Sequence, residues 1–235
     1  MNKVEAKELL DKIIRQAFGV ENPLTLEQAV EKFTFDIRMP YKVVDSTDGS
    51  ETWATSNNPT KFVKMDNARN NESSASDGLY ATQPIADLGE LLSKWDHINF
   101  TTTEHALDSL NVAESDLVTQ SENVFHSTDV HRSKNVIYSD GAYDCEFIFA
   151  SQGPVQSTFC IRSDNSVRCA NSFGITRSAD LTNCIMMHDC GDMQDSMFCT
   201  NMKGKQYCIA NMQFEKEEYE EIKKQVVQWI LTPTS

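Results

Sequence analysis

The sequence predicts a mainly β protein: a parallel, right-handed β-solenoid with an N-terminal α/β cap domain and a C-terminal capping helix. The solenoid is expected over residues 109–212, where similar side chains recur every 24 positions. Three columns carry the repeat, one of small apolar residues, one of large apolar residues and one of Ser-Asp pairs. They are Val112, Val136, Cys160, Cys184 and Cys208; Phe125, Phe149, Phe173 and Met197; and Ser115-Asp116, Ser139-Asp140 and Ser163-Asp164. Such self-similarity is typical of solenoids, because each repeat buries its apolar face only against its neighbours.

A 24-residue repeat predicts a coil of three short strands, about eight residues per side, joined by three turns. Coils of a parallel solenoid stack at about 4.8 Å, so the Val/Cys residues are expected within roughly one strand spacing of each other. The Val/Cys and Phe/Met columns are both expected to point inward as continuous ladders. The Ser-Asp pairs are expected at a corner, where the aspartates would accept hydrogen bonds from backbone N–H groups.

Two further columns accompany the Val/Cys column. Ala113, Ile137, Ile161, Ile185 and Ile209 follow it directly. Asparagines precede it at Asn111, Asn135 and Asn183, and Phe159 and Tyr207 interrupt them. The asparagines therefore predict a partial polar stack along one side of the solenoid.

Residues 1–108 are expected to form one cap domain that begins with two helices. Apolar residues at helical spacing predict a helix over residues 3–18 that ends at Gly19. The stripe consists of Ala6, Leu9, Leu10, Ile13, Ile14, Ala17 and Phe18. Thr25 stands three residues before Gln28, a capping-box pattern that predicts a second helix to about Phe33.

The rest of the cap domain is expected to mix strands, a loop and a third helix. Alternating apolar residues from Thr34 predict short strands, with a turn at Asp48-Gly49. The polar stretch 67–78 is expected to be a flexible loop. Asp87 is placed to cap a helix whose apolar side holds Leu88, Leu91, Leu92 and Trp95. This domain would cover the strand edges of the first coil.

A final helix is expected over residues 213–232. Tyr219, Ile222, Val226, Trp229 and Ile230 share one stripe, and Thr232-Pro233 ends the helix. We expect it to lie across the open end of the last coil and to bury Trp229 and Ile230 there.

Composition limits the classes of function. The chain has 21 Lys+Arg against 35 Asp+Glu, a formal net charge of -14, which disfavours direct binding to nucleic acid or an anionic membrane. No transmembrane run or signal peptide is visible. Seven cysteines, an odd number without a secretory signal, favour reduced thiols in a cytoplasmic setting.

Reactive or metal-binding groups are weighed against structural roles. Stacked Cys160, Cys184 and Cys208 would be near enough for disulfides if they were one strand spacing apart. The run CIMMHDC offers Cys184, His188, Asp189 and Cys190 to a zinc ion, although no CxxC pair is present. Asp116, Asp140 and Asp164 form a carboxylate column like those of polysaccharide-processing β-helices, but a corner role explains them better. The sequence assigns no catalytic, cofactor-binding or metal-binding residue.

The run from Lys203 to Tyr219, with YCIANMQFEKEEY at its centre, follows Cys- and Asn-rich repeats. It resembles an uncharacterised β-solenoid family met in bacteriophage and candidate-phylum bacterial genomes. The resemblance covers the solenoid and the final helix, a little over half of the chain. Bacterial members often carry amino-terminal CxxC pairs, which this chain lacks. The resemblance implies a fold and a phage setting, with no catalytic residues to carry over.

These observations predict a non-enzymatic structural or protein-interaction protein, a bacteriophage-encoded virion or assembly component. We expect a protein partner or self-assembly, no cofactor, no membrane, and a location in the cytoplasm of the host or in the virion. Two alternatives stay open. One is an acidic solenoid that mimics DNA and inhibits a nucleic-acid enzyme; the other is a carbohydrate-binding or carbohydrate-active β-helix with an outer groove of carboxylates and aromatics.

Overall fold

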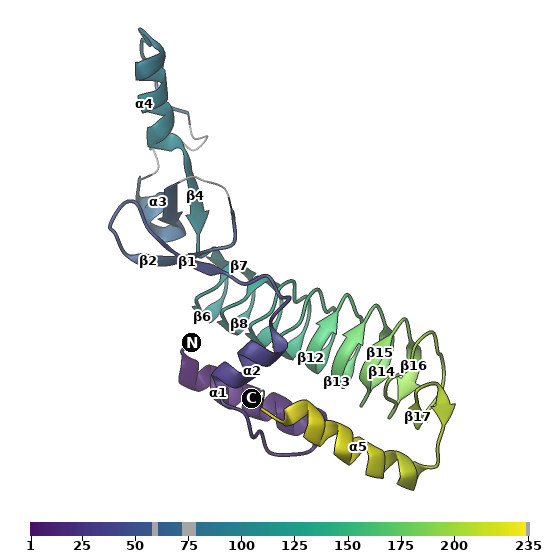
Figure 1. Cartoon of the computed structure of the whole chain (residues 1–235). Coiled ribbons are helices and arrows are strands. Elements are labelled where there is room, and N and C mark those ends of the chain that lie inside the picture. The colour runs from purple at the N-terminus through teal and green to yellow at the C-terminus, as the bar shows by residue number, and fades with distance from the viewer. Residues whose placement is uncertain (58–60, 72–78, 234–235) are drawn as a thin grey trace.

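The computed structural model describes residues 1–57, 61–71 and 79–233. A slender solenoid carries helices along one flank and a small α/β unit at its N-terminal end (Figure 1). The helices are α1 (Lys3–Phe18), α2 (Leu26–Phe33), α3 (Met65–Asn71), α4 (Leu88–Ile98) and α5 (Lys216–Leu231). The strands outside the coils are β1 (Tyr41–Val44), β2 (Glu51–Ala54), β3 (Lys61–Lys64) and β4 (Phe100–Thr103). Within the described residues, no helix is long and apolar enough to span a bilayer.

The coils are made of short parallel strands. They are β5 (Ala106–Leu107), β6 (Leu110–Ala113), β7 (Asp116–Thr119), β8 (Glu122–Phe125), β9 (Thr128–His131), β10 (Lys134–Ile137), β11 (Glu146–Phe149), β12 (Thr158–Asp164), β13 (Ala170–Thr176), β14 (Ala179–Thr182), β15 (Ile185–His188) and β16 (Gly191–Gln194). A hairpin of β17 (Cys208–Ile209) and β18 (Met212–Gln213) follows them. The predicted parallel β-solenoid with helices at both ends of the chain is confirmed.

The coil contains 12 residues, so the predicted length of 24 is wrong. In the strand register Val112 pairs with Val124, and Val124 pairs with Val136. Val112 and Val136 therefore share a column, as predicted, but lie two strand spacings apart, about 9.6 Å. The expected separation of one strand spacing is wrong, because the 24-residue repeat contains only every second member of the column.

The backbone explains the coil length. Every third residue of the solenoid turns the chain in the left-handed region, as at Asn111 (φ 55°), Glu114 (φ 53°), Leu117 (φ 57°) and Gln120 (φ 50°). Four such corners close one coil of 12 residues. Asparagine, aspartate and glycine tolerate this conformation best, and they recur at the corner positions.

Serine side chains hold successive coils together from inside. The Ser115 hydroxyl donates to the Ala113 carbonyl (2.7 Å) and accepts from the Ser127 N–H in the next coil (3.1 Å). Ser127 and Ser139 repeat the contact. Asp116 accepts from the Leu117 N–H (3.0 Å), as expected of a corner aspartate. The contact that recurs from coil to coil, however, belongs to the serines.

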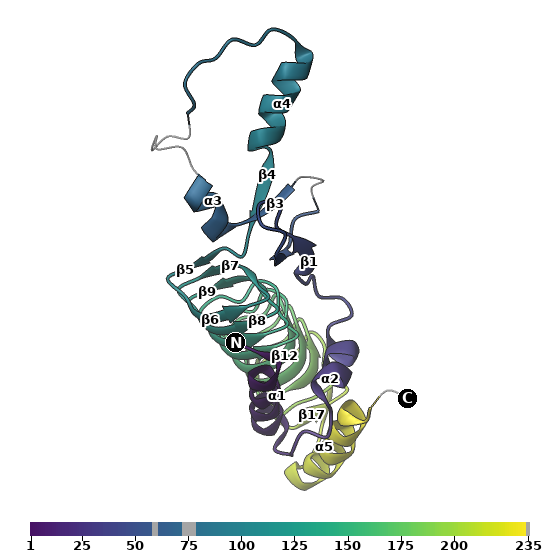
Figure 2. The same ribbon diagram turned by 90° about the vertical axis from the view of Figure 1, so that its left-hand side faces the viewer.

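The large apolar column lies outside the coil, which corrects its predicted inward direction. In the 12-residue register Phe125, Ile137, Phe149 and Ile161 are consecutive members of one column, so the two 24-residue columns merge. This column packs in one hydrophobic cluster with α1, α2 and α5. Seen nearly end-on, those three helices gather along one side of the solenoid (Figure 2). The Val/Cys column points inward, as predicted, and forms a separate cluster.

The elements of residues 1–108 lie in two separate places on the solenoid. Helices α1 and α2 lie on the flank, whereas β1–β4, α3 and α4 lie at the end of the first coil (Figure 1). Helix α3 occupies residues 67–71, so the predicted loop is wrong there, and 72–78 lie outside the described residues. Asp87 caps α4 through the Glu90 N–H (2.9 Å), as predicted.

Helix α5 turns back along the flank from the last coil (Figure 1). Tyr219, Val227, Ile230 and Leu231 are its buried residues. Ile230 is buried, as predicted, but against the flank, so the predicted position of this helix across the open end of the last coil is wrong. The predicted burial of Trp229 is also wrong, because 61% of Trp229 is exposed. A helix that packs lengthwise buries a different stripe from one that lies across the end.

Truncation after Glu215 tests the role of α5. The shortened chain should aggregate on expression or elute as large species in size-exclusion chromatography, because it uncovers apolar flank residues worth about 2 kcal/mol each when buried. A chain ending at Pro233, which retains all of α5, is the matched control and should melt cooperatively. A soluble, cooperatively melting truncation after Glu215 would contradict this role.

Candidate functional site

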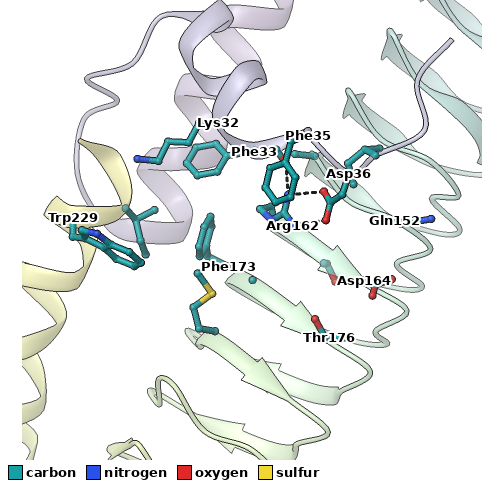
Figure 3. Close-up of a pocket in the computed structure, with 16 residues that line it drawn as sticks. Lys32, Phe33, Phe35, Asp36, Gln152, Arg162, Asp164, Phe173, Thr176 and Trp229 are labelled. Carbon is teal, nitrogen blue, oxygen red and sulfur yellow. Dashed lines mark hydrogen bonds and ion pairs between the residues drawn. The ribbon is translucent and has the colours of Figure 1, made fainter. Parts of the chain in front are cut away.

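A cleft of about 440 Å³ opens on the helical flank, between the residues after α2, the outer face of the solenoid and the end of α5 (Figure 3). Phe33, Phe35, Phe173 and Trp229 contribute aromatic rings. Gln152, Asp164 and Thr176 contribute polar side chains from the solenoid. The cleft is formed by three segments that are far apart in the sequence.

The hollow in its floor follows from one corner column of the solenoid. Ala150, Arg162, Gly174 and Met186 are successive members of this column, and all four line the cleft. Gly174 has φ 68° and no side chain, and the Met186 thioether lies in the space that a side chain there would take. A Cβ atom at position 174 would lie 2.7 Å from the Met186 Sδ, so a larger residue would crowd the floor.

Arg162 fixes one wall of the cleft. Its guanidinium donates two hydrogen bonds to the Asp36 carboxylate (2.8 and 2.7 Å) and one to the Phe33 carbonyl (2.6 Å). The same group lies 4.5 Å from the centre of the Phe35 ring. The hydrogen bond from Arg162 lowers the pKa of Asp36 below its usual value, so this carboxylate stays ionised and engaged.

A row of polar side chains borders the hollow (Figure 3). Gln152 pairs with Asp164, and Asp164 with Thr176, so successive members lie about 4.8 Å apart. One Asp164 oxygen accepts from the Asn165 amide (2.8 Å). Among the described residues, the side chains of Gln152 and Thr176 have no hydrogen-bond partner. The row therefore offers free donors and acceptors beside an apolar floor.

Cys184, His188, Asp189 and Cys190, which were considered as zinc ligands, do not converge. The Cys184 and Cys190 thiols point into the coil and donate to the Thr182 and His188 carbonyls (both 3.3 Å). Asp189 instead accepts from Arg177 on the outer surface (2.8 Å). Within the described residues, no group of His, Cys, Asp and Glu is arranged to hold a metal ion.

The cysteines proposed for disulfides are separated by other residues. Ser172 lies between Cys160 and Cys184, and Ser196 between Cys184 and Cys208. Two strand spacings exceed the range of Cα separations that a disulfide bridges. All seven cysteines are free and buried.

The aspartate column is also interrupted. In the 12-residue register Thr128 lies between Asp116 and Asp140, and Gln152 between Asp140 and Asp164. The three carboxylates are therefore not adjacent, and only Asp164 lines the cleft.

A chain of polar contacts joins the N-terminal strands to the first coil. His105 Nε2 lies 2.6 Å from Thr102 Oγ1, and its Nδ1 lies 2.6 Å from Asp116 Oδ1. Asp116 also accepts from the His105 N–H (2.9 Å) and from Thr55 (3.2 Å). A hydroxyl, an imidazole and a carboxylate in this order recur in hydrolases. The contacts here cross from strand to coil, and we assign them to fastening the two parts.

Sequence reasoning missed the cleft. Trp229 was assigned to a buried stripe, and Arg162 and Gly174 belong to none of the columns that the 24-residue repeat revealed. Ala150 and Gly174 share a column in either register, but only the 12-residue register adds Arg162 and Met186 to that column and so outlines the floor of the cleft.

Comparisons with protein-family models, with curated proteins and with solved structures gave no match.

Thiol titration tests the placement of the cysteines. Burial raises the pKa of Cys169 to about 11 and that of Cys184 to about 12. At pH 8 the native protein should react with Ellman's reagent at least about 100-fold more slowly than a free thiol, because thiolates are scarce and enclosed. In guanidinium chloride all seven thiols should react rapidly. Two or more fast thiols in the native protein would show that the columns are not internal.

Proposed function

We propose that this chain is a non-enzymatic structural protein that assembles with a second copy of itself through α4. The observation that supports this proposal is an apolar stripe on α4, a helix that stands away from the body of the protein (Figures 1 and 2). Its members are 46% to 67% exposed, and no residue of the helix is buried. They are Leu88, Leu91, Leu92, Trp95 and Ile98.

The exposed surface is large enough for a dimer. Nine of the 20 exposed large apolar residues in the described chain lie between positions 79 and 100. At about 200 Å² for a fully exposed large side chain, their exposures amount to about 1,000 Å² per chain. A standard interface takes roughly 800 Å² from each partner. Helix α4 alone falls short of this, so the interface would include the neighbouring Leu79, Tyr80 and Ile85.

The order of the apolar residues along α4 supports a second copy of this chain as the partner that covers them. Leu88 and Ile98 lie five positions on either side of Ser93, and Leu91 and Trp95 lie two positions on either side. An antiparallel pair of α4 helices would therefore place Leu88 against Ile98 and Leu91 against Trp95. Such a pair has the two-fold symmetry of an isologous dimer.

The charges of α4 also favour this pairing. Glu90 lies 3.5 Å from Lys94 on the same helix, and Asp96 pairs with Lys61. These charges are paired within each chain, so two helices can meet without adding unpaired like charge. This matters for a chain of net charge -14, whose copies otherwise repel each other.

A phage virion or assembly role remains part of the proposal. It is supported by the resemblance of the run from Lys203 to Tyr219 and by the fact that virions are built from repeated copies. The DNA-mimic alternative needs continuous rows of carboxylates. Arginine–aspartate pairs interrupt the acidic surface at Arg132–Asp144 and Arg168–Asp180, so no observation favours it.

Light scattering after size-exclusion chromatography tests the proposal. The wild-type chain should elute at twice its mass of 26.5 kDa. Leu91→Glu should weaken the dimer roughly 100-fold or more, because a two-fold axis buries the new charge twice. Ser93→Glu, on the opposite side of α4, is the matched control and should leave the dimer intact. A monomeric wild-type chain at about 100 μM, or a dimeric Leu91→Glu variant, would refute self-assembly through α4.

A further inference from the structure

We propose that the cleft on the helical flank is a binding site for a neutral oligosaccharide. This site is distinct from α4, and the proposal stands independently of self-assembly. Four properties of the cleft support it: exposed aromatic rings, an ordered polar row, charges that balance, and a suitable volume.

Two aromatic side chains of the cleft are unusually exposed. Phe35 is 76% exposed and Trp229 is 61% exposed, although both stand beside a well-packed flank. They lie on two sides of the buried Phe173 (Figure 3). Flat aromatic faces of this kind match the C–H face of a pyranose ring, which is apolar. Burying such a ring would cover surface that folding leaves in water.

The polar row supplies the complementary contacts. Gln152 presents an amide, Asp164 a carboxylate and Thr176 a hydroxyl on three successive coils. This set includes both donors and acceptors, as sugar hydroxyls require. The spacing of about 4.8 Å is fixed by the backbone ladder, and it is close to the length of one sugar unit. A sugar chain can therefore run along the solenoid axis and meet one polar group per unit.

The charges of the cleft balance. Arg162 is bound to the Asp36 carboxylate, and the Lys32 ammonium donates to the neutral Thr232 carbonyl (2.6 Å). These two cations stand against the two carboxylates that line the cleft, Asp36 and Asp164. The cleft therefore has no excess positive charge to attract an anion, and the net charge of -14 of the whole chain repels one. A neutral polyol meets no such repulsion.

The volume of the cleft limits the size of the ligand, and its carboxyl groups determine whether the ligand could be cleaved. About 440 Å³ falls within the range of small-molecule sites, so the cleft holds a short segment of a sugar chain. Glycoside hydrolysis uses one carboxyl group as acid and a second as base or nucleophile. Both oxygens of Asp36 are bound by Arg162, so of the two carboxyl groups that line the cleft only Asp164 is free to act. The site is therefore assigned to binding rather than cleavage.

Isothermal titration of the full chain with a panel of tetrasaccharides tests this inference. The neutral probes are cellotetraose, chitotetraose, maltotetraose and mannotetraose, and tetragalacturonate is the acidic probe. At least one neutral probe should bind with a Kd below about 1 mM, and the acidic probe should not. Intrinsic tryptophan fluorescence should change on binding, because Trp229 would be covered.

Variants locate the binding to the cleft. Trp229→Ala should weaken binding of that probe at least about tenfold, the loss of one aromatic contact. Thr176→Val keeps the shape and should weaken binding about threefold to tenfold by removing one hydrogen bond. Phe100→Ala, an exposed aromatic of β4 away from the cleft, is the matched control and should bind as the wild type does.

The possible results of these titrations either support or overturn binding at the cleft. No binding of any neutral probe at about 10 mM, preference for tetragalacturonate, or full affinity in Trp229→Ala would each overturn the proposal. Repeating the titration with Leu91→Glu separates it from the role of α4, since a monomer that still binds the sugar supports the cleft alone.

Discussion

The structure depends on one backbone constraint, a left-handed residue at every third position of residues 108–210. Each such residue other than glycine costs about 1 kcal/mol, which no isolated chain would sustain at this frequency. The conformation persists because each turn places N–H and C=O groups opposite those of the next coil. Serine hydroxyls at 2.7–3.1 Å extend the same ladder to the interior, as at Ser115 and Ser127. The hydrogen bonds between coils therefore offset the cost of the left-handed residues, and both recur with the same repeat.

Because equivalent positions of successive coils lie over one another, the same constraint arranges side chains in columns. Residues of one kind often follow each other within a column. Asn111, Asn123 and Asn135 form a chain of amide hydrogen bonds at 2.9 Å, which confirms and extends the predicted polar stack. Phe147 and Phe159 continue this column as stacked rings with centroids 4.4 Å apart. The aromatic residue that seemed to interrupt the asparagines therefore has its own partner one coil away.

The sequence showed the fold class and the helices more clearly than the coil. Phe149 and Phe173 alternate with Ile161 on the flank, so the visible period is twice the real one. Large and small residues alternate there because the flank packs against helices, which cannot be inferred from periodicity alone. Trp229 was misplaced for the same reason: its stripe was recognised, but the face it presents depends on the direction in which α5 leaves the last coil.

Covering the flank also determines where apolar surface remains accessible. Helices α1, α2 and α5 together bury most of the Phe/Ile column, and the cleft lies where Gly174 and the ends of α2 and α5 leave it open. The coil interior is filled with buried valine, cysteine, isoleucine, leucine and methionine side chains. Recognition by this chain is therefore confined to surfaces that the repeat does not use for stacking. The cleft and α4 are two such surfaces with exposed aromatic residues that packing does not explain.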